Sequence, residues 1–483
     1  MDEGVALLVV GAILAASIVV ALGAARTGLP VLVAFLGLGM LLGSDGPGGV
    51  EFDDAELTRQ AGTVGLALIL YEGGLQTSWR RLREVAVPAT LLSTVGVAAS
   101  TLVTGLAAHV LFSLSWLEAF LLGAVVASTD AAAVFSTLRF THIRRRIART
   151  LEAESGGNDP MAIALTLGLI AWIEHPRTHG FADLVVLVVR QLGLGLVVGI
   201  ALGAVATLVF ARIPESIGAF APVASVAAAS LSFGVADTIG GSGFLAVYLV
   251  GLAVGSTPSR YRRQLAAFHE GIAFVAQVGL FVLLGLLVFP HRLPGVALSG
   301  LALAFLLMLV ARPAAVWVST AASAYTHRER MLLGWAGLRG AVPIVLATFA
   351  LTSSVQHSQT IFNAVFFVVI VSTLVQGTTL EWLAQRLGLT SPASPVPDGD
   401  AGSLGELELV EFTVAGNHSI NGSAVSELGL PRDALVAVIK RDGEAIQPSG
   451  SSVIEAGDEL SVLVPRHRRP DLEDVFERWR RLI

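Results

Sequence analysis

Residues 154–173 read ESGGNDPMAIALTLGLIAWI, and this stretch decides how the rest of the chain is interpreted. Two acids, an amide and a proline stand directly before a long run without charge. A carboxylate inside hydrocarbon is costly, so one found there indicates a functional site. The chain has 483 residues, of which 54% are hydrophobic and only 14% are charged. Because a soluble domain carries about a quarter charged residues, this composition predicts an integral membrane protein with many spans.

Several classes of function are excluded by what the sequence lacks. It contains no cysteine, which excludes disulfides, thiolate metal sites and cysteine nucleophiles. The sequence contains no basic domain that could bind nucleic acid, so we expect no nucleic-acid partner. The phosphate-binding pattern GxxxxGK[ST] is absent, so ATP-driven pumping has no support.

The hydropathy pattern predicts an all-α polytopic membrane protein with about thirteen transmembrane helices, since a span needs about 20 apolar residues. The runs near 120–137 and 334–347 are interrupted by glycine. Paired interrupted helices in two halves of a chain are typical of transporters with inverted repeats, and we expect two interrupted helices that cross. The expected helices are 5–25, 29–43, 61–76, 86–112, 116–137, 155–174, 181–210, 216–237, 243–256, 264–289, 296–321, 330–352 and 360–386.

Basic residues are concentrated in alternate loops. Arginines occur in WRRLRE, RFTHIRRRIART, ARIPES, SRYRRQ and THRERM, whereas SDGPGGVEFDDAE (44–56) is acidic and SVQHSQ (354–359) has neither Lys nor Arg. Cytoplasmic loops carry the excess of Lys and Arg. We therefore expect a multi-pass membrane protein with the N-terminus outside and the C-terminus in the cytoplasm.

The composition changes after Leu387. We expect a transmembrane domain over 1–387, a Pro/Ser/Gly linker over 388–403, and a small α+β cytoplasmic domain over 404–466. In that domain LELVEFTV reads as a strand, SAVSELGL as a short helical turn, and ALVAVIKRDGEAIQP as two strands around an Asp-Gly turn; SSVIEAGDELSVLVP repeats the two-strand pattern. Residues 467–483 predict an amphipathic helix with an apolar face. The residues of that face are Leu472, Val475, Phe476 and Trp479.

The acidic stretch has the spacing of one helix face. Ser155, Asn158 and Asp159 follow each other at i, i+3 and i+4, and Glu154 borders the same face. Pro160 has no N–H, which frees the carbonyl of Gly156 from its helical bond. Free backbone oxygen beside a carboxylate and a hydroxyl suits a hard monovalent cation. The alternative is an acid near a helix end that reaches water.

A second polar break lies in VVASTDAAAVF (125–135), where Thr129 and Asp130 interrupt an apolar run. An unwound segment offers the Thr129 carbonyl or hydroxyl, while Asp130 caps the half-helix that follows. A cap at a conventional helix start is the alternative. Two acids in separate spans can converge, and this favours an ion site.

Two further charges lie within predicted spans. Arg339 lies in GWAGLRGAVPIVLA (334–347), and a guanidinium within a span requires an anionic partner. We expect that partner to be Glu154, which leaves Asp159 free to titrate. The alternative is an arginine that reaches the cytoplasmic interface. Glu72 in LILYEGGLQ is either a gate carboxylate or a residue at a helix end.

Together these pieces resemble a known family. The chain is similar to bacterial monovalent cation:proton antiporters of the cation:proton antiporter-1 family, and more narrowly to potassium/proton antiporters that carry a TrkA-C (RCK C-terminal) domain. The matching pieces, in the family's order, are LALILYEGGLQTSW, GAVVASTDAAAVF, ESGGNDPMA, GSGFLAVYLVGLAVG, GLRGAVPIVLA and LVQGTTL. Residues 404–466 resemble TrkA-C over its full length.

The resemblance implies a location in the bacterial cell (inner) membrane and a homodimer with a dimer domain and a moving core domain. It implies that Asp159 binds cation or proton, with Asn158, Ser155, Thr129 and Asp130 forming the site, and that Glu154 and Arg339 form a structural pair. The Asn-Asp pair resembles the electroneutral branch, which exchanges cytoplasmic K⁺ (or Na⁺) for external H⁺ in cation and pH homeostasis. The metal is then a monovalent cation held at Asp159, Ser155 and Thr129.

Some alternatives remain open at this point. Oxygen ligands serve Na⁺, Li⁺ and K⁺ alike. The TrkA-C domain is expected to bind a small-molecule regulator, which in some relatives is a cyclic dinucleotide, or else to dimerise or stabilise the protein. A gated cation channel would need a complete filter sequence. An intramembrane enzyme could use Asp130 and Asp159 as a dyad, but the motifs favour exchange, and we expect no enzyme activity and no cofactor beyond the transported ions.

Overall fold

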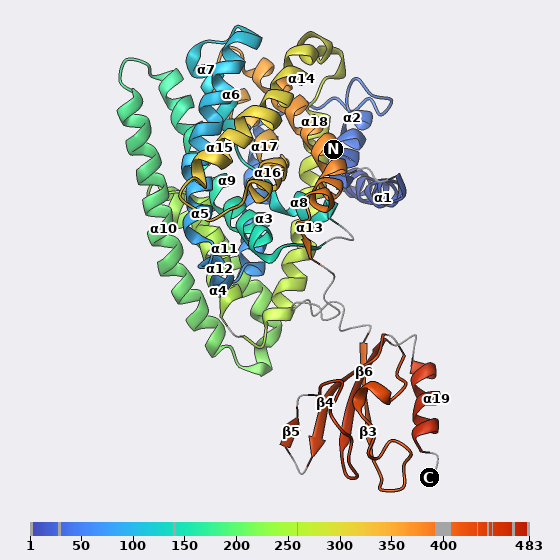
Figure 1. Cartoon of the computed structure of the whole chain (residues 1–483). Coiled ribbons are helices and arrows are strands. Elements are labelled where there is room, and N and C mark those ends of the chain that lie inside the picture. Colours follow the sequence, from blue (N-terminus) through green and yellow to red (C-terminus); the bar gives the residue numbers. More distant parts are fainter. Residues whose placement is uncertain are drawn as a thin grey trace. The chain divides into compact units, whose positions relative to one another are not determined.

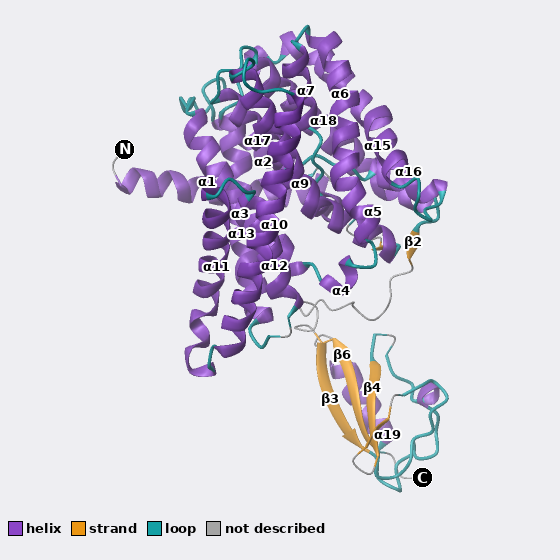
Figure 2. Ribbon diagram, turned by 90° about the vertical axis from the view of Figure 1, so that its left-hand side faces the viewer, coloured by secondary structure: helices purple, strands orange, loops and turns teal. Residues whose placement is uncertain are grey.

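The chain forms two compact units, residues 1–393 and 394–483. The computed structural model describes residues 3–27, 30–138, 142–257, 259–391, 407–431, 433–441, 444–446, 448–465 and 469–480. Most of the expected linker, 388–403, lies outside these described residues. The first unit is a bundle of helices and the second contains a small antiparallel sheet (Figures 1 and 2).

Helices occupy each of the apolar segments predicted from the sequence. Six helices in the described part of the chain are long and apolar enough to cross a membrane, and shorter apolar helices lie between them. The helices are α1 (Glu3–Thr27), α2 (Val31–Leu42), α3 (Ala55–Gln76), α4 (Trp79–Leu82), α5 (Ala86–Leu91), α6 (Val97–Phe112), α7 (Trp116–Val125), α8 (Ala131–Thr137), α9 (Arg145–Glu174), α10 (Phe181–Arg212), α11 (Ala221–Thr238), α12 (Gly243–Ser256), α13 (Arg262–Leu286), α14 (Ala297–Leu306), α15 (Arg312–Ser319), α16 (His327–Trp335), α17 (Ala341–Leu351) and α18 (Ser358–Arg386).

The outer helices expose apolar side chains, as a lipid environment requires. On α10, for example, Phe181, Val186 and Ile200 are 71%, 64% and 61% exposed. In contrast, α9 is buried along most of its length, including Glu154, Asn158 and Asp159. A polar helix segment is therefore enclosed by the bundle and shielded from lipid.

Two helices are interrupted, and the interruptions cross each other. The first break separates α7 from α8 at residues 126–130, and the second separates α16 from α17 at residues 336–340. The backbone N–H of Asp130 donates to the carbonyl of Leu338 at 2.9 Å, which joins the two breaks. The prediction of two interrupted crossing helices is confirmed.

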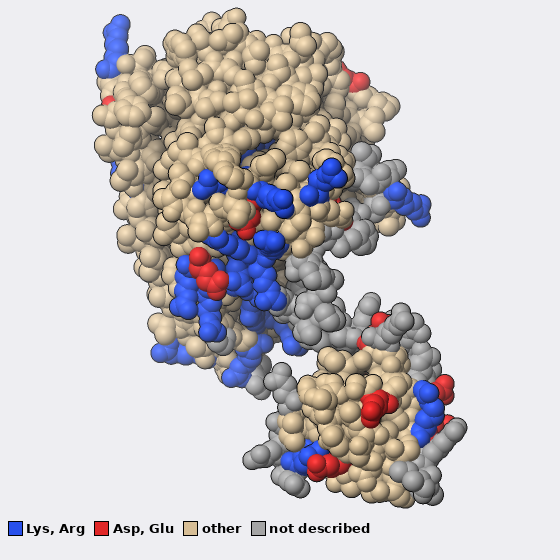
Figure 3. Space-filling view, in the orientation of Figure 1, with Lys and Arg blue, Asp and Glu red and all other residues tan. Residues whose placement is uncertain are grey.

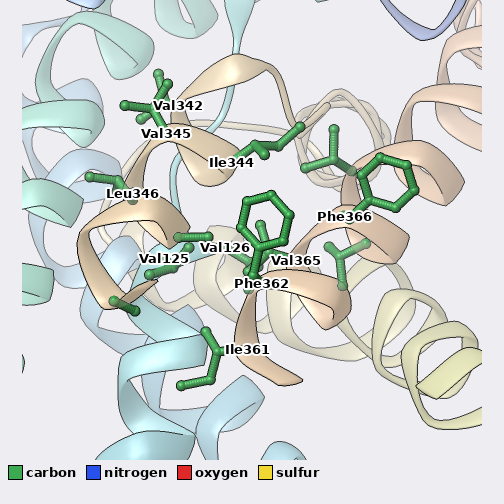
Figure 4. Packing of buried hydrophobic residues seen from close by; sticks show 14 of the residues in the cluster. Val125, Val126, Val342, Ile344, Val345, Leu346, Ile361, Phe362, Val365 and Phe366 are labelled. Atoms are coloured by element: carbon green, nitrogen blue, oxygen red, sulfur yellow. The ribbon is translucent and has the colours of Figure 1, made fainter. Parts of the chain in front are cut away.

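Apolar packing holds this crossing in place. Figure 4 shows Val125 and Val126 from the end of α7 beside Val345 and Leu346 of α17, with Phe362 of α18 close to both groups. All of these side chains are buried. Because a packed core resists deformation, the polar break is held in a rigid apolar frame.

The two halves repeat the same order of elements. In the first half, α5 continues through a π-helical turn (Leu92–Gly96) into α6, then comes the broken pair α7–α8, then the long helix α9. In the second half, α14 continues through a π-helical turn (Leu307–Ala311) into α15, followed by α16–α17 and α18. Four described helices, α10 to α13, lie between the two three-span repeats, so corresponding spans are seven apart and run in opposite directions. This arrangement is an inverted repeat.

The second unit is a four-stranded antiparallel sheet in the order β3-β6-β4-β5. Its elements are β3 (Leu407–Thr413), a 3-10 turn (Val425–Glu427), β4 (Leu435–Arg441), β5 (Glu444–Ile446), β6 (Glu459–Pro465) and α19 (Arg469–Trp479). The expected Asp-Gly turn lies outside the described residues. The expected strand pair over 451–465 is reduced to β6, with Val453 making an isolated bridge to Ala424.

The C-terminal helix completes the core of this unit. The predicted apolar face of α19 is confirmed, because Leu472, Val475, Phe476 and Trp479 are all buried. The indole N–H of Trp479 donates to the carbonyl of Leu428 at 2.8 Å. The helix is therefore an integral part of the sheet's core.

Candidate cation-binding site

The central helix α9 brings three predicted residues to one level. Asn158 and Asp159 are 0% and 5% exposed, and Ser155 lies one turn earlier on the same face. The helix runs without interruption through Pro160. The irregular backbone that an ion site needs therefore comes from the crossing breaks in α7–α8 and α16–α17.

The first break docks directly onto this face of α9. The Asn158 Nδ2 donates to Thr129 Oγ1 at 2.6 Å, and the backbone N–H of Ala131 donates to Ser155 Oγ at 3.3 Å. The Asp130 carboxylate accepts a bond from the Ala133 N–H at 3.0 Å and so caps α8, as predicted. The structure thus brings these predicted residues together with Asp159.

Several buried oxygens at this point have no partner among the described residues. They are Asp159 Oδ1, Asn158 Oδ1 and Ser128 Oγ. The Asp159 carboxylate also lies close enough to Asp130 and Arg339 to interact electrostatically with both. Buried polar atoms are nearly always satisfied, and oxygen atoms of this kind suit a hard monovalent cation. The donor set fits a transported cation or a proton on Asp159.

Arg339 is fixed by the end of α7. Its Nη1 donates to the carbonyl of Ala127 at 2.7 Å and also to the carbonyl of Ser128. These carbonyls lie just beyond the C-terminal end of α7, where the helix dipole is negative. The guanidinium is 1% exposed. It therefore neutralises the end of the half-helix next to Asp159.

The expected pair of Glu154 with Arg339 is wrong. Glu154 binds Arg312 through two parallel bonds, Nη2 to Oε2 at 2.8 Å and Nη1 to Oε1. Both side chains are almost fully buried. Arg312 is the first residue of α15, directly after a π-helical turn, and lies on the buried face, whereas Arg339 is already held by backbone carbonyls.

The structure does not join Glu72 to this site. Glu72 lies near the C-terminal end of α3 and is partly exposed. Its carboxylate accepts a bond from Gln76 Nε2 on the same helix, and its acidic neighbour is Glu270 of α13. It belongs to a separate acidic pair, distinct from the cluster around Asp159.

The second break is held by polar side chains of α18. Ser372 Oγ accepts from the Arg339 N–H at 3.3 Å and Thr373 Oγ1 donates to the Arg339 carbonyl at 3.1 Å. Gln376 Nε2 donates to the Trp335 carbonyl at 2.8 Å. Gln376 lies in LVQGTTL (374–380), to which the sequence alone assigns no role, and Ser372 and Thr373 directly precede this stretch. Together they satisfy backbone groups that the break leaves unpaired.

Two small or polar residues of the site were missed from the sequence. Ser128 lies beside Asp159, and its only signal was its place in the Ser-Thr-Asp interruption. Gly340 faces the Asp130 carboxylate so closely that a Cβ would overlap Oδ2. Gly340 is the last residue of the second break, and a glycine at an interruption of an apolar run is the signal that could have identified this close approach.

Two family models match this chain. The sodium/hydrogen exchanger transmembrane model matches residues 13–386, and the TrkA-C domain model matches residues 409–477. The second match extends beyond the expected boundary at 466 and includes most of α19, consistent with the burial of that helix on the sheet.

Individual relatives cover nearly the whole chain. It is 37% identical over 474 residues to the K(+)/H(+) antiporter NhaP2 of Shewanella baltica, covering 97% of this chain and 82% of that protein. The K(+)/H(+) antiporter NhaP of Alkalimonas amylolytica is 37% identical over 477 residues, covering 97% and 83%. The Na(+)/H(+) antiporter ApNhaP of Aphanothece halophytica is 27% identical over 363 residues, covering 71% and 68%.

A solved structure shares the fold. The sodium proton antiporter MjNhaP1 of Methanocaldococcus jannaschii superposes with a TM-score of 0.71 at 23% identity, covering 80% of this chain and 99% of that one.

Proposed function

We infer that this chain, which belongs to the sodium/hydrogen exchanger family, is a secondary antiporter that exchanges K⁺ for H⁺ at Asp159. The family consists of transporters, so the chain is not an enzyme. The observation that carries the proposal is the convergence of unpartnered buried oxygens from Asp159, Asn158 and Ser128 where the two broken helices cross.

Exchange follows from competition at one carboxylate. A bare Asp159 carboxylate would be unfavourable in a water-poor site. Either a proton or a cation neutralises it, and only the neutralised site crosses the low-dielectric barrier. Because the two ligands exclude each other, one cation moves for one proton, and the exchange is electroneutral. Protons at low cytoplasmic pH then inhibit cation export by occupying the same site.

The surrounding residues have separate roles in this proposal. Thr129 and Ser155 supply hydroxyl oxygens to the cation, and Asn158 orients Thr129 through the bond at 2.6 Å. Asp130 caps α8 and adds negative potential. Arg339 offsets part of that negative charge, so that a monovalent cation suffices to balance the site. Glu72 is proposed as a gate carboxylate outside the site.

The relatives favour K⁺ as the cation. Those named as K(+)/H(+) antiporters match almost the whole chain at 37% identity, whereas the one named as a Na(+)/H(+) antiporter matches less of it at 27%. Na⁺ (or Li⁺) exchange is the second candidate, because the same oxygen ligands accept these ions.

The membrane orientation is proposed from charge. Exposed arginines gather around one end of the helical unit (Figure 3). By the positive-inside rule that end faces the cytoplasm, with the N-terminus outside and the C-terminus inside a bacterial cell membrane. In the basic loops WRRLRE, RFTHIRRRIART, SRYRRQ and THRERM, the exposed arginines are Arg80, Arg81, Arg83, Arg144, Arg145, Arg146, Arg260, Arg262, Arg263 and Arg328.

The TrkA-C unit is proposed to regulate exchange from the cytoplasm, through a small ligand such as a cyclic dinucleotide bound within residues 404–466. The alternative is a stabilising or dimerising appendage. Deleting residues 400–483 and finding unchanged affinity and rate would support the appendage. We also propose a homodimer, to be tested by native mass spectrometry.

Proton flux in proteoliposomes tests the exchange. A proton gradient is imposed on liposomes loaded with a pH dye, and K⁺, Na⁺ or Li⁺ is then added. The assay is repeated at pH values from about 6 to about 9, because the group that exchanges the proton must change its protonation state near the working pH. The proposal expects K⁺-dependent proton flux that valinomycin leaves unchanged, since no net charge moves. Asp159→Asn should abolish it, and Asp53→Asn, in an exposed loop, is the matched control. Flux that survives in Asp159→Asn would contradict the assignment.

A further inference from the structure

A groove with a volume of about 460 Å³ opens on the lipid-exposed side of the helical unit, between α15, α16 and α18 and the π-helical turn before α15. This is within the size range of pockets that bind small ligands. Its walls are almost entirely apolar. The residues that line it include Met308, Leu309, Trp317, Arg330, Met331 and Trp382.

The backbone shapes the groove. Gly334 on α16 leaves its floor open, and a Cβ there would still lie 3.6 Å from Pro313 Cα of α15. The mouth faces outward, since Leu309, Met331 and Trp382 are 58%, 53% and 63% exposed. In a membrane-spanning bundle such side chains are in contact with lipid. The occupant must therefore enter from the bilayer.

The groove has one charged end. The guanidinium of Arg330 lies 4.9 Å from the centre of the Trp317 ring. Its Nη2 donates to the carbonyls of Thr320 at 2.9 Å and Ser323 at 3.3 Å, which fixes its position. Its Nε is buried and has no hydrogen-bond partner among the described residues. Arg330 also lines the groove, and a guanidinium held in a fixed position is suited to phosphate.

The rest of the groove runs away from this charge into apolar surroundings. Trp317 is near the end of α15 and Trp382 near the end of α18, and Trp side chains favour the level of the headgroups. Leu309 lies eight positions before Trp317, which corresponds to roughly 12 Å along a helix. The groove thus changes from cationic and aromatic at one end to aliphatic at the other.

We propose that this groove is a binding site for an anionic phospholipid. Its phosphate is held at Arg330 between Trp317 and Trp382, and one acyl chain lies along the groove toward Leu309. Anionic headgroups accumulate at the arginine-rich end of the helical unit. The positive charge of Arg330 at one end of the groove explains a preference for anionic over zwitterionic lipid.

A lipid bound in the groove would affect the ion site through α16. Trp335, the last residue of α16, donates its indole N–H to Thr379 Oγ1 at 2.9 Å and accepts a bond from Gln376 at its carbonyl. The next residues form the break that carries Arg339. A lipid wedged against α16 and α18 would stabilise this arrangement, and exchange should rise with the fraction of anionic lipid.

Native mass spectrometry of the purified full chain tests the binding directly. After removal of lipid, the protein is titrated with phosphatidylglycerol or with phosphatidylcholine of identical acyl chains. We expect one tightly held phosphatidylglycerol per chain, and phosphatidylcholine held roughly five-fold more weakly, the effect of one arginine at the membrane surface. Arg330→Gln should abolish the difference between the two lipids.

Two further variants keep the test decisive if Arg330→Gln fails to fold. Leu309→Trp fills the groove from an exposed position and should remove the tight lipid, and Trp382→Ala should weaken it. Trp79→Ala, an exposed tryptophan outside the groove, is the matched control and should change nothing. Equal binding of the two lipids by wild type, or wild-type binding by Leu309→Trp, would overturn the proposal. Because binding is read by mass, the outcome stands whether or not K⁺ exchange is found.

Discussion

The buried pair of Glu154 and Arg312 gives the most quantitative prediction. The two groups share parallel hydrogen bonds, one of 2.8 Å, and their side chains are 1% and 4% exposed. Removing one member of such a pair leaves an uncompensated buried charge and destabilises a protein by about 3–5 kcal/mol. Replacing both by apolar residues of similar volume is often neutral or stabilising. We therefore expect strong non-additivity.

The perturbation is a double-mutant cycle built from Glu154→Met and Arg312→Met. Each single variant should lose about 3–5 kcal/mol of unfolding free energy, and the double variant should recover most of that loss. Unfolding free energies are measured by titrating the purified protein from mild detergent into SDS. A second cycle with Arg339→Met serves as the comparison.

The comparison separates the observed pair from the expected one. Arg339 is bound to the carbonyls of Ala127 and Ser128, so its coupling to Glu154 is only through space, and we expect it to be weaker than the coupling of the directly bonded pair. The reasoning is refuted if Glu154 and Arg312 are additive within ~0.5 kcal/mol, or if Glu154 couples more strongly to Arg339.

Two further predictions concern close packing and acid stability. Gly340→Ala places a methyl group on the Asp130 carboxylate. This overpacking costs about 1–3 kcal/mol and should reduce K⁺-dependent proton flux at least about ten-fold. Gly271 has open space around it, so the control variant Gly271→Ala should retain the wild-type flux. In the TrkA-C unit, the bidentate bond from Arg441 lowers the pKa of Asp458. A lowered folded-state pKa contributes stability above the unfolded value, near 3.9, that is lost as pH falls through the folded value. The protection of residues 407–465 against hydrogen exchange in the full chain, taken relative to the intrinsic exchange rate at each pH, should therefore fall below about pH 4. Asp458→Asn should remove that dependence, and unchanged protection in acid would contradict the assignment.

Hydropathy predicted the helical unit well, because a span must satisfy its own backbone and avoid charge. The apolar runs became helices, and the polar interruptions at Thr129–Asp130 and near Arg339 became the two breaks. The helical spacing of Ser155, Asn158 and Asp159 placed them on one face. These features depend on local sequence, which is why a single chain reveals them.

The partner of Glu154 could not be predicted in the same way. Glu154 and Arg312 are 158 positions apart, and both Arg312 and Arg339 are arginines in otherwise apolar runs. The choice between them depends on the π-helical turn before Arg312 and on the carbonyls that already bind Arg339. Both are tertiary features with no local signal.

The proline in the acidic stretch also misled the local reading of α9. Pro160 predicted a free carbonyl as the source of backbone ligands, but the helix continues through it. Neighbouring helices stabilise such a position inside a bundle. The unwound backbone near Asp159 comes instead from the segment that contains Thr129 and Asp130, joined to Leu338 across the crossing.

The central claim is that one carboxylate, Asp159, holds either a proton or a cation. Proton release from the purified, weakly buffered protein on addition of K⁺ measures this most directly. The account predicts release of about one proton per chain, saturating with K⁺ binding, and no release from Asp159→Asn. Undiminished proton release from Asp159→Asn, or K⁺ binding by the wild type without any proton release, would contradict it.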